Sequence, residues 1–472
     1  MAQILDLATR NVWRNRRRSL TTMVAVAVGA LSIVLFGGFV ANIFVGIETT
    51  MVKTAGHIHV YRNGYFLFGS GDPSGYGIAR YRDVMRLIEQ DAEMKPMLEV
   101  VTPRLQLSGI AGNFAENVSK TFLGVGLVPS DRERMIAWDA YKALVPVPSY
   151  GLDDARPEEA VVGVGMARML HLCRALGGKN CPTPPAKAVA AQTQEGAALA
   201  ALATAEGTAE GTADGKGAEQ APAGATARID LLAATASGAP NAVPVTVIAA
   251  KSMGAKPLDE SFVVMPIAQA QRLVYGRGEP RATAIVLQLK STSMLPAARA
   301  RLEALFKSEG LDLEVLDFAQ LDPWYNQVRG MFTAIFGFIA ALMAVIVLFT
   351  VVNTMSMAVV ERTREIGTLR ALGMRRGAIR RLFLAEGAVL GLIGASLGVG
   401  LALLLAWLVN GSGMTWTPPN NVEPVPLLVR AAGSPSLLAL AWAGLAAVAV
   451  LSSLFPANRA ARLEIVEALR HA

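Results

Sequence analysis

The chain has 472 residues, of which 53% are hydrophobic and 17% are charged, and its formal net charge is +7. This composition is more apolar than that of an ordinary soluble protein. Arginine is concentrated in three short segments beside apolar runs, at 10–18, 362–381 and 459–470. Such a distribution is typical of the cytoplasmic border of a membrane protein and argues against a nucleic-acid-binding surface.

The N-terminal segment, residues 1–18, predicts a short amphipathic helix on the membrane surface, followed by an arginine-rich run. Residues 19–47 contain no charge, and this run exceeds the roughly 20 residues that a membrane-spanning helix needs. A cleaved signal peptide is the alternative, but its hydrophobic region is usually about half as long. We therefore expect a retained transmembrane helix whose N-terminus is cytoplasmic.

Residues 48–329 have the mixed charge and turn residues of a water-soluble α+β domain. Because one membrane-spanning helix precedes it, this domain is expected outside the cytoplasm, in the periplasm. The expected strands are 57–61, 100–110, 121–128 and 311–316, and the expected helices are 81–90 and 297–308.

One part of this domain, residues 186–228, contains no aromatic residue and consists largely of Ala, Gly, Thr, Glu and Gln. Such a segment buries too little apolar surface to offset the entropy that ordering costs, so the composition predicts a disordered insertion. The alternative is a helix at about 197–205, where alanine is frequent.

Three more apolar runs follow the domain, and the chain is therefore expected to be a membrane protein with four transmembrane α-helices. The large extracytoplasmic α+β domain is inserted between helices 1 and 2. All three arginine-rich segments then lie on the cytoplasmic side. The expected boundaries are helix 2 at 330–360, a cytoplasmic segment at 361–381, helix 3 at 382–410, an outer loop at 411–435, helix 4 at 436–455 and a cytoplasmic tail at 456–472.

The cytoplasmic segment 361–381 has the pattern of a short helix. Ile366, Leu369 and Leu372 recur at helical spacing, and Gly373 stands where a left-handed residue often ends a helix. The segment is then either an interaction helix or a loop that only fixes the orientation of the chain in the membrane. Spacing alone leaves both interpretations open.

The same residues carry a family resemblance. The run Glu361-Arg-x-Arg-Glu-Ile-Gly-x-Leu-Arg-Ala-Leu-Gly373 resembles the signature of the FtsX-like/MacB-type permeases of ABC transporter systems, which include the lipoprotein-releasing LolC/LolE type. The ending from Pro456 to Arg470 and the entry from Asn11 to Ser19 are similar to the same family. The outer domain resembles it only loosely, through residues 162–170, and the insertion departs from it.

The resemblance implies a permease subunit of the bacterial inner membrane that forms a homodimer or a heterodimer and works with a dimeric cytoplasmic ABC ATPase. Both chain termini would be cytoplasmic. The residues that match the family's ATPase-coupling segment are Glu361, Arg362, Arg364, Glu365, Ile366, Gly367, Leu369, Arg370, Ala371, Leu372 and Gly373. We expect apolar members of this set (Ile366, Leu369, Leu372) to fill a groove on the ATPase, with arginines (Arg362, Arg364, Arg370) at its acidic rim.

The chain contains no Gly-x4-Gly-Lys-[Ser/Thr] phosphate loop. We therefore expect no cofactor and no catalysis in this chain, with ATP and Mg bound by the partner ATPase. The expected substrate is a lipoprotein, lipid, peptide or drug, and membrane lipid, a periplasmic carrier, an adaptor or an outer-membrane protein are further expected partners. The alternative is an FtsX-like signalling subunit that activates an outer partner such as a cell-wall hydrolase.

Helix 3 has small residues along one face. Gly387, Gly391, Gly394 and Gly398 follow two G-x3-G spacings, which allow close approach of another helix from the same chain or from a second copy. Glu386 is the acid at the entry of this helix. It is expected to pair with Arg380 or Arg381, or to lie in the headgroup layer.

The remaining candidate residues lie in the outer domain. Cys173 and Cys181 are the two cysteines of the chain, and outside the cytoplasm they favour a disulfide, with two free thiols as the alternative. His57 and His59 share a face of an expected strand. No carboxylate or cysteine cluster lies near them in the sequence, so no metal site is expected.

Overall fold

The computed structural model describes residues 2–14, 16–73, 75–142, 145, 147–177, 227–253, 256–416 and 424–464. These residues form two compact units, each with its own core. The first contains Met1–Glu48, Asp322–Pro419 and Glu423–Ala472, and the second contains Thr49–Leu321 and Asn420–Val422. Most of the predicted insertion 186–228 and Cys181 lie outside the described residues.

The first unit is helical. Its helices are α1 (Ala2–Arg14), α2 (Arg16–Ala55, which continues into the second unit), α11 (Pro323–Glu361), α12 (Thr363–Ala371), α13 (Arg376–Gly411) and α14 (Pro435–Arg462), with short strands β10 (Thr415–Trp416) and β11 (Val425–Pro426). Four of the described helices, α2, α11, α13 and α14, are long and apolar enough to cross a membrane, with 40, 39, 36 and 28 residues. The prediction of four long apolar helices is confirmed.

The ends of these helices follow local chemistry. The Asp322 side chain accepts a hydrogen bond from the Trp324 backbone N–H at 3.0 Å, and Pro323 occupies the first position of α11, where a missing N–H costs nothing. Helix α14 continues to Arg462, seven residues beyond the predicted end at 455. It continues through Pro456, and the alanines that follow are buried against neighbouring helices.

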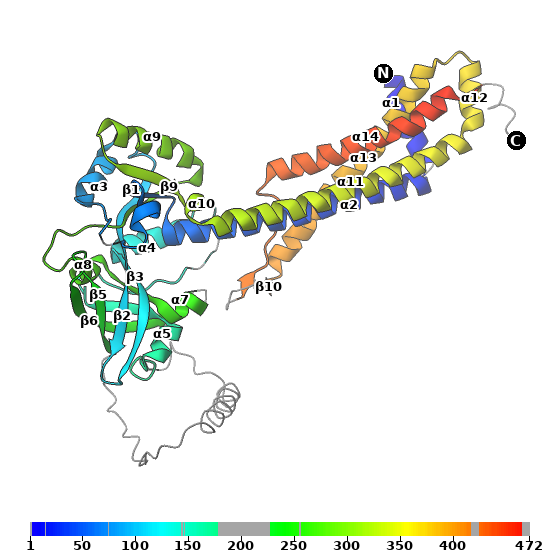
Figure 1. Cartoon of the computed structure of the whole chain (residues 1–472). Coiled ribbons are helices and arrows are strands. Elements are labelled where there is room, and N and C mark those ends of the chain that lie inside the picture. The colour runs from blue at the N-terminus through cyan, green and yellow to red at the C-terminus, as the bar shows by residue number, and fades with distance from the viewer. Residues whose placement is uncertain are drawn as a thin grey trace, which may run out of the picture. The chain divides into compact units, whose positions relative to one another are not determined.

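The core of the helical unit joins α2, α11, α13 and α14. Val26, Val351, Leu390 and Leu445, one from each helix, are almost fully buried in a single apolar cluster. Figure 1 shows these helices running beside one another, with α1 and α12 at the same end of the bundle. Arg14 of α1 and Leu463, which follows α14, both contact α12.

The second unit is an α+β domain. Its strands are β1 (Ile58–Arg62), β2 (Leu98–Asn113), β3 (Val118–Leu127), β4 (Glu159–Gly163), β5 (Arg228–Ala234), β6 (Pro240–Lys251), β7 (Phe262–Pro266), β8 (Ala284–Leu289) and β9 (Leu313–Asp317). Its helices are α3 (Tyr81–Gln90), α4 (Pro129–Ala137), α5 (Val164–Met169), α7 (Lys256–Ser261), α8 (Ile267–Tyr275), α9 (Leu295–Ser308) and α10 (Phe318–Leu321), with a π-helix η1 (Tyr65–Gly69) and a 3-10 helix η3 (Thr292–Met294). The predicted strands at 57–61, 100–110, 121–128 and 311–316 and the predicted helices at 81–90 and 297–308 are confirmed.

One long strand organises this domain. The strands are ordered β3-β7-β4-β6-β5-β2-β8-β1-β9, and β3 also pairs with β2, which closes six strands into a ring. Strand β2 serves both parts of the sheet. Residues Leu98 to Arg104 pair with β8, and residues Leu105 to Asn113 pair with β3.

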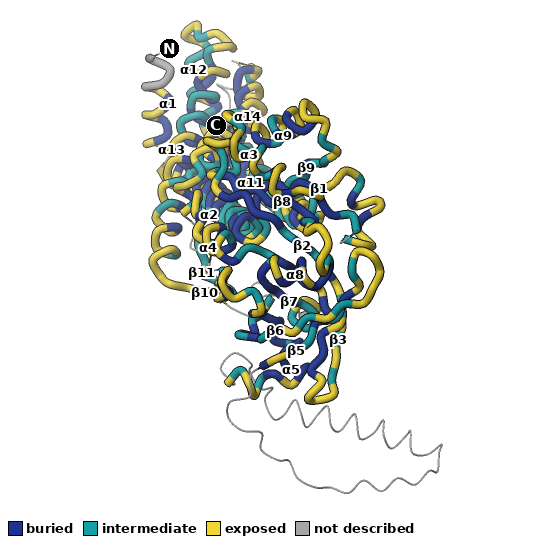
Figure 2. The backbone as a smooth tube through the Cα atoms, turned by 90° about the vertical axis from the view of Figure 1, so that its left-hand side faces the viewer, coloured by how far each residue is buried: buried dark blue, intermediate teal, exposed yellow. Residues whose placement is uncertain are grey.

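The domain has two main apolar cores. The larger one takes residues from all six strands of the ring and from α5 and α8, and the other lies between the β2-β8-β1-β9 strands and helices α3 and α9. Figure 2 shows buried backbone along the strands and exposed backbone on many of the loops and outer helices.

Candidate functional site

The segment between α11 and α13 contains one short helix, α12, which ends at a glycine. Gly373 has a φ of +96°, the left-handed conformation that a residue without Cβ adopts most readily. The Gly373 N–H donates to Arg370 O at 3.0 Å, and the Met374 N–H donates to Leu369 O at 3.1 Å. These two bonds are the Schellman pattern of helix termination. The predicted left-handed end at Gly373 is confirmed.

The inner face of α12 is buried against the membrane helices. Ile366 is 3% exposed and lies in a cluster with Ile379 and Phe383 of α13 and Ala457 of α14, and Leu369 is half-buried against the same cluster. Burying a side chain of this size contributes about 1.5–3 kcal/mol. The expectation that Ile366 fills a partner's groove is wrong for this conformation, because its own chain already covers it.

The outer face of α12 points away from the chain. Leu372 is 81% exposed at the end of the helix, and Arg364, Ala371 and Gly373 are also exposed. The short turn after Gly373 leads to Arg375, which precedes α13 and is exposed as well. The helix therefore presents one large apolar side chain together with arginines, on a rigidly capped end.

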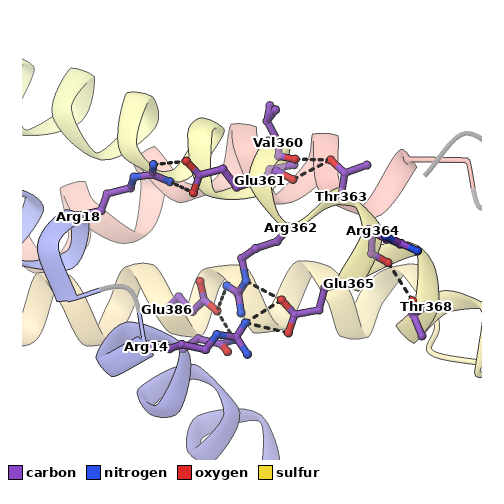
Figure 3. A network of polar contacts seen from close by, with 12 residues as sticks. Arg14, Arg18, Val360, Glu361, Arg362, Thr363, Arg364, Glu365, Thr368 and Glu386 are labelled. Atoms are coloured by element: carbon purple, nitrogen blue, oxygen red, sulfur yellow. Dashed lines mark hydrogen bonds and ion pairs between the residues drawn. The ribbon is translucent and has the colours of Figure 1, made fainter. Parts of the chain in front are cut away.

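Ion pairs connect α12 and the end of α11 to the N-terminal helices, as Figure 3 shows. Glu365 of α12 accepts hydrogen bonds from Arg14 Nη2 of α1 at 2.8 Å and from Arg362 Nε at 3.1 Å. Glu361, the last residue of α11, pairs with Arg18 of α2. These contacts join the first turns of the chain to a segment more than 300 residues later.

The buried centre of the network is Glu386 of α13. Its Oε1 accepts hydrogen bonds from Asn11 Nδ2 at 2.6 Å and from Arg362 Nη1 at 2.9 Å. The Glu386 and Arg362 side chains are only 7% and 11% exposed. The expected pairing with Arg380 or Arg381, or a place in the headgroup layer, is therefore wrong. Both of those arginines are exposed, whereas Glu386 lies on the buried face of the helix.

The ion pairs of this network favour the charged forms of Glu365 and Arg362. Burial acts to raise the pKa of Glu365, but the hydrogen bonds from Arg14 and Arg362 outweigh it and hold that pKa below its ordinary value. Burial acts to lower the pKa of Arg362, but the charge and hydrogen bond of Glu386 raise that pKa above its ordinary value. The stabilisation from Glu365 is therefore present at neutral pH and is lost as the pH falls through the lowered pKa.

Comparison with known proteins places this site in a recognised family. Residues 337–465 match the family described as FtsX-like permease C-terminal. That range contains most of α11 and all of α12, α13 and α14, which include the buried cluster and the exposed face described above. In this range the chain is similar to the FtsX-like permeases.

Curated relatives agree with this assignment. The chain is 27% identical over 221 residues to the macrolide export ATP-binding/permease protein MacB of Bdellovibrio bacteriovorus (44% of this chain, 31% of the relative). It is 32% identical over 165 residues to the uncharacterized ABC transporter permease YknZ of Bacillus subtilis (34% and 36%). It is 31% identical over 228 residues to the pyoverdine export ATP-binding/permease protein PvdT of Pseudomonas entomophila (48% and 32%). The chain thus spans about a third of the length of these relatives.

The four glycines of α13 contact two different helices of the same chain. A Cβ on Gly387 or Gly391 would meet Ser453 or Ala449 of α14 within 3 Å. A Cβ on Gly394 or Gly398 would meet α2, where the nearest atom to the Gly398 position is a backbone oxygen at 2.3 Å. Gly387 and Gly391 thus allow close approach of α13 to α14, and Gly394 and Gly398 allow close approach of α13 to α2.

The other candidate residues lie in the α+β domain. Cys173 packs against the larger core, while Cys181 lies outside the described residues, so their pairing stays a prediction. His57 and His59 are buried, and burial lowers the pKa of each to about 3. Within the described part of the chain, no group of His, Cys, Asp and Glu is arranged to hold a metal ion.

Sequence reasoning missed the N-terminal part of the site. The sequence places Asn11, Arg14 and Arg18 in an amphipathic entry and its positive border, but their side chains bind the acids of α11, α12 and α13. The available signal was the resemblance of the Asn11–Ser19 segment to the same family as the α12 segment. Charge alone did not reveal which acid each residue meets.

Proposed function

We propose that this permease couples ATP hydrolysis by a separate cytoplasmic ATPase to motion of its α+β domain, which drives release or export of a substrate. The observation that carries the proposal is the exposure of Leu372, 81%, at the capped end of a helix whose other face is buried. A large apolar side chain beside arginines is the composition of a protein docking surface. In this proposal ATP and Mg are bound by the partner.

The contacts of α12 supply a route for the motion. Ile366 joins it to α13 and α14, Arg362 follows α11 directly, and Glu365 binds Arg14 of α1. The α+β domain is joined in the chain to the ends of α2 and α11. Movement of α12 by the bound ATPase would therefore be transmitted to α2 and α11, the helices that are joined to the α+β domain.

The orientation and the partners belong to the same proposal. We propose that the arginine-rich α12 end faces the cytoplasm of a bacterial cell and that the α+β domain lies on the other side of the membrane, because positive charge favours the cytoplasmic side. In the most apolar 18-residue stretch of α11, only 11% of the residues are buried within the chain, compared with 50% in the corresponding stretch of α2. Lipid or a second permease copy then covers the outward face of α11.

The test is to purify the full chain in maltoside detergent with the ABC ATPase encoded by a neighbouring gene. We expect a stable complex and an ATPase rate that rises when the substrate is added in proteoliposomes. Failure of the chain to bind an ABC ATPase would contradict the proposal. Stimulation by an extracytoplasmic cell-wall hydrolase, without a transported substrate, would instead assign the chain to signalling.

A further inference from the structure

A small pocket in the α+β domain is rich in positive charge. It is lined by Thr102 and Arg104 of β2, Arg132 of α4, and Thr54 and Ala55 at the end of α2. The cavity has a volume of about 30 Å³. Because one water needs roughly 10–15 Å³ by this measure, the pocket has room for two oxygen-sized atoms.

Neither arginine in this pocket forms a salt bridge with a carboxylate among the described residues. Arg104 forms no salt bridge or side-chain hydrogen bond there. Arg132 is 6% exposed; its Nη1 donates to Lys53 O at the end of α2, but its Nε is buried without a hydrogen-bond partner. Burial lowers the pKa of Arg132, and the charge of Arg104 lowers it further, against opposing effects of Tyr150 and of the charge of Glu133.

The threonine in the pocket adds a third unsatisfied group. Thr102 is 6% exposed, and its Oγ1 is buried without a hydrogen bond. It shares a face of β2 with Arg104, two positions further along the strand. The carboxylate of Asp131 does not line the pocket, but burial raises the pKa of that carboxyl, and the Thr102 hydroxyl, which lies within its reach, acts to lower it. Asp131 is also bound by Arg134 at 3.2 Å. An unpartnered donor in a protein interior costs about 1–3 kcal/mol, so a ligand that satisfies these groups would bind favourably.

We propose that this pocket binds a phosphate group, with two of its oxygens placed between Arg104, Arg132 and Thr102. A phosphate carries a charge between about −1 and −2 at neutral pH, which matches two arginines that lack acidic partners. Guanidinium groups bind phosphate oxygens through charge-assisted hydrogen bonds, and the hydroxyl donates one more. The phosphate comes either from solution or from a lipid headgroup, since α2, whose last residues line the pocket, is a candidate membrane span. The proposal does not depend on ATPase docking.

The test uses the full chain in maltoside detergent and two probes at constant ionic strength. Inorganic phosphate is titrated by calorimetry, with acetate as the comparison anion, and short-chain phosphatidylglycerol is titrated by native mass spectrometry. Arg104→Gln removes the free guanidinium without touching the contact between Arg132 and α2, and Thr102→Val removes only the hydroxyl. Arg228→Gln, at an exposed arginine of β5, is the matched control. Circular dichroism and a monodisperse elution profile establish that each variant is folded.

We expect saturable binding of at least one phosphate probe, weakened at least tenfold by Arg104→Gln, several-fold by Thr102→Val and not at all by Arg228→Gln. Binding of phosphatidylglycerol alone identifies a lipid headgroup as the source, and binding of inorganic phosphate alone identifies the free ion. The proposal is overturned if neither probe saturates the site, if Arg104→Gln binds as tightly as the wild type, or if acetate binds as tightly as phosphate.

Discussion

At the scale of single residues, a buried carboxylate holds the α12 end of the bundle together. Glu386 accepts hydrogen bonds from Asn11 and Arg362, so one side chain of α13 fixes both α1 and the start of α12. Exposed ion pairs such as Arg14–Glu365 contribute at most about 1 kcal/mol. Loss of one partner from a buried pair costs more, because the other charge stays buried.

Glu386→Gln is therefore expected to destabilise the helical unit by about 2–4 kcal/mol, because Arg362 loses its buried counter-charge. The measurement is the midpoint of thermal unfolding of the detergent-solubilised chain. Glu303→Gln is the control, since that glutamate is 53% exposed in its pair with Arg299. Equal midpoints for the two variants would show that the Glu386 pair does not stabilise the bundle.

His57 in the α+β domain is held in one neutral form. The Leu289 N–H donates to its Nδ1 at 3.0 Å, so the proton lies on Nε2, which is 3.0 Å from Thr292 Oγ1. Burial lowers its pKa to about 3 from an ordinary value of 6.5. A second proton on Nδ1 would face the Leu289 N–H, which is itself a donor, and the hydrogen bond between them would be lost.

The stability of the α+β domain should consequently fall as the pH is lowered from 6.5 toward 3. In that window the unfolded chain takes up a proton at His57 and the folded chain does not, which costs about 1.4 kcal/mol per pH unit for each such histidine. His57→Gln should reduce this slope in unfolding experiments at several pH values. His171→Gln, at an exposed histidine, is the control, and an unchanged slope in His57→Gln would refute the assignment.

At the scale of elements, α13 is the helix around which the bundle is packed. Its glycines let it approach α14 near its start and α2 further along. Gly398 has the tightest backbone contact with α2, because an added Cβ would lie 2.3 Å from Ala27 O and 2.6 Å from Ala30 Cβ. Gly400, on the same helix, has no atom within 4 Å of that position.

Gly398→Ala is expected to destabilise the bundle by about 1–3 kcal/mol, since the backbone of α2 must move to make room for the methyl group. Gly400→Ala should be neutral or stabilising, because alanine favours a helix over glycine by about 1 kcal/mol. Each variant adds one methyl group to the same helix, so the two differ only in the position of that group. Unfolding midpoints that fall equally in both variants would mean that contact between α2 and α13 is not the cause.

At the scale of the whole molecule, the sequence predicts elements better than it predicts side-chain partners. The uncharged runs and the alternating strand pattern were sufficient to find the four long helices and strands such as β1 and β9, since these signals are local. The Schellman end at Gly373 was also predictable, because a helix stop is encoded within a few residues.

The missed features depend on contacts between distant segments. Glu386 meets Asn11 across 375 positions and not its neighbours Arg380 or Arg381, and only the folded arrangement of α1 and α13 brings that pair together. Ile366 has the spacing of an interaction face, but apolar spacing does not distinguish a face that binds a partner from one that packs within the chain. The division of α12 into a buried and an exposed face was therefore beyond sequence reasoning.

The central claim is that the exposed end of α12 binds an ATPase, and Leu372→Asp tests it most directly. Leu372 is 81% exposed, so a charged residue there leaves the fold of the chain intact. Leu67→Asp, at a leucine that is 80% exposed in the α+β domain, is the matched control. The affinity of the detergent-solubilised chain for its ABC ATPase is measured for both variants. We predict at least a tenfold loss for Leu372→Asp, as for a central apolar contact of an interface, and no loss for Leu67→Asp; equal, undiminished affinity in both would contradict the account.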